Sequence, residues 1–116
     1  MSDRSAARAI SFDVASIHAA GYECAVERIS TIFEADSVTC ELYIVLSPAE
    51  QLLLEDRRAA VREERESFDR TLEPAWKAAV ERATGRRVTA LLTKTRLWPH
   101  VTLLVFILGR PRPHRR

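Results

Sequence analysis

The chain has 116 residues, of which 47% are apolar and 29% charged, and its formal net charge is +2 at pH 7. This length is near the commonest domain size, so a single domain with its own core is expected over residues 1–109. The longest apolar run, Leu103 to Leu108, is far shorter than the roughly 20 residues of a membrane-spanning helix, and the first residues form no basic-then-apolar secretion signal. The composition therefore predicts a cytoplasmic protein.

The N-terminal segment predicts an amphipathic helix from about Ser5 to Ala20. Ile10, Val14 and Ile17 recur at the i, i+4, i+7 spacing that gathers apolar side chains on one helix face. Gly21 follows, and a glycine commonly ends a helix in the left-handed conformation. The helix is therefore expected to stop at this glycine.

Two strands are predicted next, from about Cys24 to Phe33 and from Val38 to Leu46. The second strand alternates cleanly between apolar and polar residues, so one of its faces is expected in the core. The expected hairpin sets Cys40 opposite Thr31 rather than opposite Cys24. A disulfide is therefore not expected, and both cysteines are interpreted as small apolar core residues.

A long helix is predicted from Pro48 to about Ala83. Ser47 is the expected N-cap, the proline takes the first helical position, and Glu50 completes a capping box. Unbroken, this helix would be roughly 55 Å long, whereas a domain of this size is only about 35 Å across. The helix must therefore bend or project, and Pro74 is the expected break because it removes a backbone donor.

A second hairpin is predicted after Gly85, with its turn at Thr95–His100 and its last strand over Val101–Leu108. The order helix, glycine, strand, turn and strand thus occurs over residues 10–46 and again over residues 74–108. We therefore predict an α+β fold of two αββ units joined by the long charged helix. The two hairpins form one four-stranded antiparallel sheet with helices on one face.

The last strand is apolar on both of its faces, so both sides of it need a cover. Helices on one side of the sheet would leave the other side bare, and exposed apolar patches of this kind mark interfaces. We expect a homodimer, with Leu104, Phe106 and Leu108 as its candidate interface. The alternative is that the long helix wraps over the bare face.

Candidate contacts for another partner lie on the long helix and in the second hairpin turn. The helix mixes arginine and glutamate, which is typical of a solvated face laced with weak ion pairs. If it is a docking surface instead, Arg58, Arg62 and Arg65 are the candidate contacts. Trp98 and His100 are a second candidate, because an aromatic and a titratable group share a turn.

No group of residues predicts catalysis, a cofactor or a metal. The three histidines are His18, near the expected polar side of the first helix, His100 in a turn and His114 in the tail, and nothing pairs them as metal ligands. No serine lies in a nucleophile-elbow context, and there is no glycine-rich phosphate loop. We therefore expect neither a catalytic site nor a cofactor or metal site, and no enzyme activity.

The C-terminal residues 110–116 alternate arginine with proline, which predicts an extended, disordered basic tail. Its four arginines account for more than the whole net charge, so the rest of the chain is mildly acidic. Nucleic-acid binding through the tail is the alternative function. The acidic body of the domain argues against it.

Several short motifs follow one another between Leu46 and Leu108. They are Leu46-Ser47-Pro48-Ala49-Glu50, Val61-Arg62-Glu63-Glu64-Arg65, Phe68, Pro74, Ala79-Val80-Glu81, Thr84-Gly85-Arg86-Arg87-Val88 and Val105-Phe106-Ile107-Leu108. In the order and spacing of these motifs, rather than in any single one, the segment resembles the MpsC-like family of bacterial proteins, which is named for a subunit of a sodium-linked, membrane-potential-generating transport system.

The resemblance implies a small cytosolic accessory or regulatory protein and carries over no catalytic residues. The second hairpin turn, usually acidic in the family, is here Leu97-Trp98-Pro99-His100. The sequence thus leads to the hypothesis of a non-catalytic, homodimeric interaction domain that assists or regulates a membrane transport system. The expected partner is a subunit of that system, contacted through the charged helix.

Overall fold

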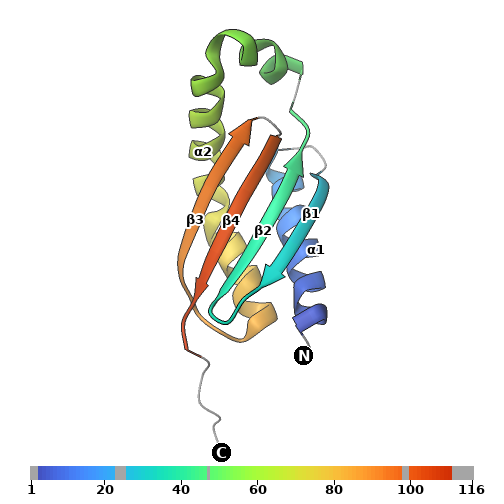
Figure 1. Cartoon of the computed structure of the whole chain (residues 1–116), viewed down its shortest axis with the longest axis vertical. Helices are drawn as coiled ribbons and strands as arrows, with labels where there is room; N and C mark the ends of the chain where they lie inside the picture. The colour runs from blue at the N-terminus through green and yellow to red at the C-terminus, as the bar shows by residue number, and fades with distance from the viewer. Residues whose placement is uncertain (1–2, 23–25, 47, 98–99, 111–116) are drawn as a thin grey trace, which may run out of the picture.

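The computed structural model describes residues 3–22, 26–46, 48–97 and 100–110, and it measures 59 × 21 × 21 Å along its principal axes. Two helices and four strands follow one another in these residues: α1 (Asp3–Tyr22), β1 (Val26–Phe33), β2 (Ser37–Ile44), α2 (Pro48–Thr84), β3 (Val88–Leu97) and β4 (His100–Leu108). The strands form one antiparallel sheet in the order β1-β2-β4-β3. Both helices pack behind this sheet (Figure 1), which confirms the α+β fold with helices on one face.

The core lies between the two helices and the inner face of the sheet. Every second residue of the central strands points into it, as the pleat of a strand requires. Trp76 of α2 is fully buried there, and its indole Nε1 donates a hydrogen bond of 3.3 Å to the Val14 carbonyl of α1. The other buried residues of this core are Ile10, Val38, Cys40, Leu42, Ile44, Leu46, Val80, Val88, Leu104, Phe106 and Leu108.

The pairing of the first hairpin agrees with the sequence prediction. Thr31 lies opposite Cys40, as the position of the turn required. Cys40 is a free, fully buried thiol, and burial raises its pKa to about 11. Cys24 lies outside the described residues.

Gly21 does not end α1 in the left-handed conformation, so the prediction made for this glycine was wrong. The helix continues to Tyr22, and Gly85 is the glycine of positive φ in the described chain. A Cβ added to Gly21 would lie 3.0 Å from a Leu72 methyl and 3.4 Å from the Phe68 ring. The glycine therefore serves the close approach of the two helices rather than a chain reversal.

The long helix bends and projects as its length required, but it does so at a different residue from the one predicted. Arg57 has non-helical angles, φ −137° and ψ 49°, whereas Pro74 lies inside the continuous part of α2. Pro74 and Arg70, whose carbonyl loses its donor, are both on the exposed side of the helix, where water can bond that carbonyl. Ser47 lies outside the described residues, so the capping box remains a prediction.

The first part of α2, with the kink inside it, extends past the end of the sheet (Figure 1). We call residues 48–64 the arm. Apart from the buried Val61, the arm's described side chains between residues 57 and 64 are exposed. No described helix is both long enough and apolar enough to cross a bilayer.

The second hairpin is longer than predicted. Thr95, Arg96 and Leu97 were assigned to its turn, but they continue β3, and His100 already begins β4. The registers pair Leu97 with His100 and Thr95 with Thr102. Residues 98–99, between the two strands, lie outside the described part of the chain.

The connection from α2 to β3 is fixed by a short polar motif. The Thr84 hydroxyl accepts a hydrogen bond from the Arg86 amide, and the Glu81 carboxylate accepts one from the Val88 amide. Arg86 reaches across the sheet end, where it bonds the Gly109 carbonyl at 2.8 Å and the Asp36 carboxylate at 2.9 Å. Three segments far apart in sequence are thus tied together by one guanidinium.

Gly85 allows this connection because its φ of +67° lies in the left-handed region. Gly85→Ala should lower the free energy of unfolding by about 1 kcal/mol, since an L-residue with a Cβ is strained there. Nothing lies within 4 Å of the added Cβ, so the loss is a backbone effect alone. Urea unfolding measures it, and Gly85→Asn, which tolerates this conformation better, should lose less. Equal stability of native and Gly85→Ala proteins would contradict the assignment.

Candidate functional site

A group of polar side chains is buried between the two helices, where the arm joins the rest of α2. It comprises His18 and Tyr22 of α1 with Glu50, Arg65 and Asp69 of α2, and we call it the interhelix cluster. His18 and Asp69 are fully buried, and Arg65 is 2% exposed. Burial of ionisable groups is costly unless they are paired, so the contacts within this cluster decide whether the helices can pack.

Tyr22 is the centre of the interhelix cluster. Its hydroxyl lies 2.6 Å from Asp69 Oδ1, to which it donates, and 3.1 Å from the Arg65 carbonyl. Its ring stacks on His18 with centroids 4.4 Å apart and meets Phe68 edge-on at 4.6 Å. Burial and the bond to Asp69 raise the pKa of this phenol well above its usual range, so it remains a hydrogen-bond donor.

Arg65 joins the two sides of the kink at Arg57. Its Nε lies 2.8 Å from Glu50 Oε2 and its Nη2 lies 3.1 Å from Glu50 Oε1, which is a bidentate pairing. The guanidinium carbon also lies 4.5 Å above the Tyr22 ring. Since Glu50 belongs to the arm, this pair holds the arm against the body of the domain.

His18 is neutral in this environment. Burial, with the positive charge of Arg65 as a smaller cause, lowers the pKa of His18 to about 4. Neither ring nitrogen has a hydrogen-bond partner among the described residues. His18 therefore packs as an aromatic ring, and its protonation would place a second positive charge beside Arg65.

The pKa of Asp69 is shifted upward, whereas that of His18 is shifted downward. Burial raises the pKa of its carboxyl, while the Tyr22 hydroxyl and Arg65 act to lower it. Oδ2 of Asp69 has no hydrogen-bond partner in the described part of the chain. Chemically, the interhelix cluster combines hydrogen-bond donors, two carboxylates and a stacked ring, and its contacts join α1 to α2.

The described residues also line two open hollows at the other end of the domain. One, of about 500 Å³, lies between Asp3, Phe33, Ala83 and Leu108, and the other, of about 520 Å³, lies beside Arg82 and Arg87. Among the described residues, no group of three or more His, Cys, Asp or Glu side chains could hold a metal ion.

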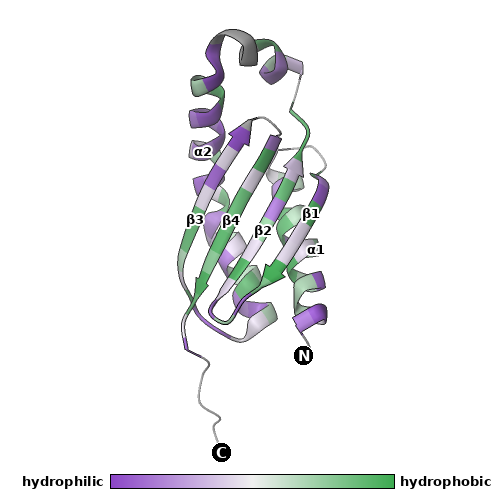
Figure 2. Cartoon of the chain, viewed as in Figure 1, coloured by the Kyte–Doolittle hydropathy of each residue, from purple (hydrophilic) through white to green (hydrophobic). Residues whose placement is uncertain are grey.

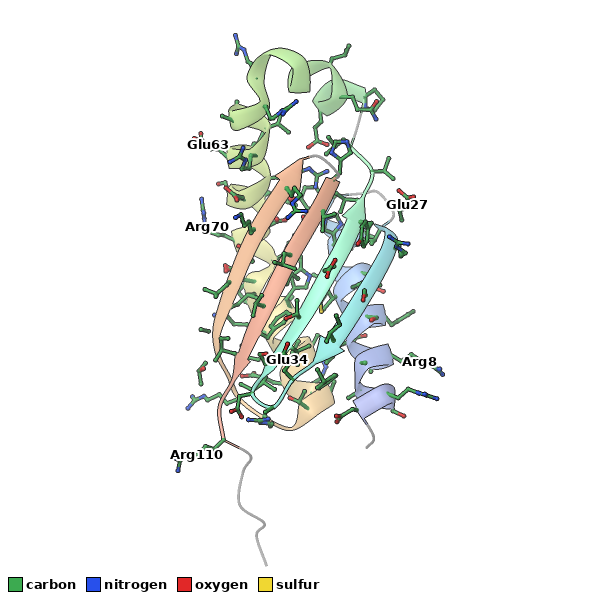
Figure 3. The ribbon with its side chains drawn as sticks, viewed as in Figure 1. Arg8, Glu27, Glu34, Glu63, Arg70 and Arg110 are labelled. Carbon is green, nitrogen blue, oxygen red and sulfur yellow. The ribbon has the colours of Figure 1, made fainter. Side chains whose placement is uncertain are left out.

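The structure separates the candidate partner contacts. Arg58 and Arg62 are exposed on the arm, whereas Arg65 is buried in the interhelix cluster, so the prediction that grouped it with them was wrong. His100 is half-buried at the start of β4, and Trp98 lies outside the described residues. Figure 3 shows Glu63 and Arg70 also pointing outward from α2.

The residues chosen for a dimer interface lie in the core. Leu104 and Phe106 are fully buried and Leu108 is 6% exposed, all beneath the helices. The assignment of these three residues to an interface was wrong because the alternation of β4 did not show which face the helices cover. The open face of β4 carries Val101, Leu103, Val105 and Ile107, which are half-buried.

The interhelix cluster was not predicted from the sequence, although a signal was present. Ala6, Ile10, Val14 and His18 are spaced four residues apart and are all buried, so His18 continues the apolar face of α1. Arg65 and Asp69 follow Val61 at the same spacing. Polar residues that continue a buried helical stripe are therefore candidates for a buried cluster.

The neutral His18 predicts a pH-dependent stability. Its folded pKa lies below its unfolded value of 6.5, so its stabilising contribution is complete above pH 6.5 and is lost as pH falls toward 4. The loss between pH 7 and pH 5 should be about 2 kcal/mol. Asp69 acts in the other direction, because its raised pKa favours proton uptake by the folded state.

His18→Phe isolates this contribution, since it keeps a ring against Tyr22 and cannot take up a proton. Chemical denaturation at pH 7 and pH 5 should show a smaller loss of stability for the variant than for the native protein. The same loss in both proteins would mean that His18 does not titrate in this range.

We expect the carboxylate of Glu50 to hold the arm in place, because it pairs with the buried Arg65. Glu50→Gln leaves the buried guanidinium of Arg65 without its carboxylate partner and should lower the free energy of unfolding by about 2 kcal/mol. Loss of a fully buried pair would cost more, but Glu50 is 23% exposed. Hydrogen exchange over residues 48–64 should become faster while the β2·β4 amides stay protected. Glu63→Gln, the same change at an exposed position, is the control. Unchanged exchange in Glu50→Gln would contradict this role.

A known protein family matches nearly the whole chain. Residues 2–110 match the family described as "Na+-translocating membrane potential-generating system (MpsC)". No curated protein and no solved structure gives a significant match. Because the match covers nearly the whole sequence, the chain belongs to the MpsC family.

Proposed function

We propose that this chain is a non-catalytic accessory component of a sodium-linked, membrane-potential-generating system and that it acts by docking onto another subunit. The family description supports the link to such a system. The arm is the single structural observation that carries the docking part of the proposal. It projects beyond the sheet and exposes charged side chains that contribute nothing to the core (Figure 1).

Arg58 and Arg62 form the proposed contact on the arm. They are four residues apart and therefore lie on one side of the helix, and both are exposed. Like charges at this spacing repel each other, so the pair does not stabilise the isolated helix. An acidic segment of the partner would relieve this repulsion, and charge complementarity would also speed the encounter.

The proposal includes a cytoplasmic location and a homodimer, as expected from the sequence. The docking contact then reaches a membrane subunit from the cytosolic side. Nucleic-acid binding through the C-terminal arginines is not part of the proposal. Residues 111–116 lie outside the described part of the chain, and no comparison supports that activity.

Charge reversal on the arm tests the docking surface. The doubly substituted protein R58E/R62E should keep its fold by circular dichroism and lose the membrane transport subunits that co-purify with the tagged native protein. Solubilised host membranes treated with nuclease are the source, and mass spectrometry identifies the recovered subunits. The physical reason is that two attractive contacts become repulsive.

The matched control is R4E/R8E, which makes the same change of charge four residues apart on the exposed side of α1 (Arg8 is labelled in Figure 3). It should recover the same subunits as the native protein. If R58E/R62E still recovers the transport subunits, Arg58 and Arg62 of the arm are not the contact. Failure of the native protein to recover any transport subunit would remove the accessory assignment itself.

A further inference from the structure

The outer face of the sheet is uncovered, and its side chains are arranged as a grid. Both helices lie on the other side (Figure 1), and Figure 2 shows that β4 is hydrophobic along most of its length. Val101, Leu103, Val105 and Ile107 of β4 therefore form an apolar strip along the middle of this face. Side chains of mixed character flank the strip: Ala90, Leu92, Lys94 and Arg96 from β3, Thr39, Glu41 and Tyr43 from β2, and Arg28, Ser30 and Ile32 from β1.

The strand registers define rows that cross this face. Glu41 pairs with Leu103, and Leu103 pairs with Lys94, so an acidic and a basic residue flank the apolar strip in one row. In the next rows, Tyr43, Val101 and Arg96 lie together, as do Thr39, Val105 and Leu92. In the Leu103 row, the charges on the two sides of the strip are therefore of opposite sign at the same height along the strands.

We propose that a second copy of this chain packs on the outer face, related by a two-fold axis that runs over β4 parallel to the strands. Such an interface is isologous, so each contact occurs twice. The rotation places β4 over β4, and β3 over β2, of the other copy. Because the axis is parallel to the strands, each cross-strand row of one copy lies over the same row of the other. Lys94 then lies opposite Glu41 of the second copy, and the apolar strip packs on itself.

The geometry of sheet packing suits this contact. Sheets that pack face to face lie about 10 Å apart with strand directions within about 30° of each other. The exposed Lys94 side chain is long enough to reach a carboxylate across that gap. The Tyr43 hydroxyl donates to Glu41 Oε2 at 3.2 Å, and Arg28 lies 4.2 Å over the Tyr43 ring, so the carboxylate is held on the outer face.

Charge distinguishes this axis from the other two-fold arrangements of the same face. An axis between β4 and β2 would set Arg96 opposite Arg28 of the second copy and Glu41 opposite Leu103. An axis across the strands would set β3 on β3, so Lys94 would lie opposite an apolar or basic residue of that strand and not opposite Glu41. Buried charges without partners and like charges in contact are unfavourable. Of these three arrangements, only the axis over β4 sets Lys94 opposite Glu41, and it sets Arg96 opposite Tyr43.

The size of the contact predicts a dimer of modest affinity. Three overlapping strands about 4.8 Å apart and about 27 Å long give a projected face of roughly 400 Å², and its accessible area is larger. Standard interfaces bury about 800 Å² on each partner, so this one lies toward the small end. We therefore expect a dimer that dissociates on dilution.

This inference gives a geometry to the homodimer of the proposed function, but it does not depend on the membrane partner. Its test uses the purified chain alone. Failure of the dimer would therefore leave the docking role of the arm untouched, and failure of the docking role would leave the dimer untouched.

Charge reversals at Lys94 and Glu41, made singly and then mixed, test the proposed contact. K94E alone places two acidic pairs in each dimer, and E41K alone places two basic pairs. Each should raise the dissociation constant of the homodimer at least about tenfold, a change of about 1.4 kcal/mol, by sedimentation over a concentration series. An equimolar mixture of K94E and E41K should dimerise again, because both contacts of the mixed dimer then join opposite charges.

The recovery in the mixture is the decisive result, since no contact within one chain can produce it. Phe12→Glu, which adds a charge at an exposed apolar position of α1, is the control and should dimerise like the native protein. Val105→Glu should be monomeric at concentrations where the control is dimeric. A native protein that stays monomeric at every concentration, unchanged dimerisation of both single variants, or a mixture that stays monomeric would each overturn the proposal.

Discussion

Trp76 lies where α1, α2 and the sheet meet, and the remaining structure depends on the packing around it. Its ring is fully buried in the core, and its indole nitrogen bonds the backbone of α1. This contact brings both helices to the same face of the sheet, and Gly21 lets them approach closely. Full burial of such a side chain is worth several kcal/mol, so few other residues could hold two helices and a sheet together.

Placing both helices on one face has two consequences for function. It leaves the outer face of the sheet without a cover, although β4 presents an apolar strip there. It also leaves the first part of α2 with no sheet beneath it, because the helix is longer than the strands that it follows. The two candidate interaction surfaces are therefore products of one packing arrangement, and they lie far enough apart to be used independently.

The interhelix cluster shows how this arrangement accommodates charge. Arg65 and Asp69 would be expensive to bury alone, but Glu50 and Tyr22 pair with them at short distances. The cost of this solution is a neutral His18 and several polar atoms without partners in the described residues. This contact also links the position of the arm to ionisable groups, because Glu50 of the arm pairs with Arg65.

Local rules in the sequence determined most of the elements. The alternation of β2 fixed which of its residues are buried, the turn length set Thr31 opposite Cys40, and Gly85 marked the end of α2. These features depend on neighbours within a few residues, so periodicity and turn chemistry are sufficient to predict them. The bend of α2 also followed from its length.

Only the tertiary structure decided which side of β4 faces the helices, where α2 bends, and which polar residues are buried. β4 is apolar on both sides, so its alternation could not place Leu104 inside and Leu103 outside. Pro74 is tolerated on an exposed helix side, and the kink lies instead at Arg57, within the arm. The four-residue spacing of His18, Arg65 and Asp69 with buried apolar residues marks them as candidates for burial, but their partners come from distant parts of the chain, and no local pattern identifies those partners.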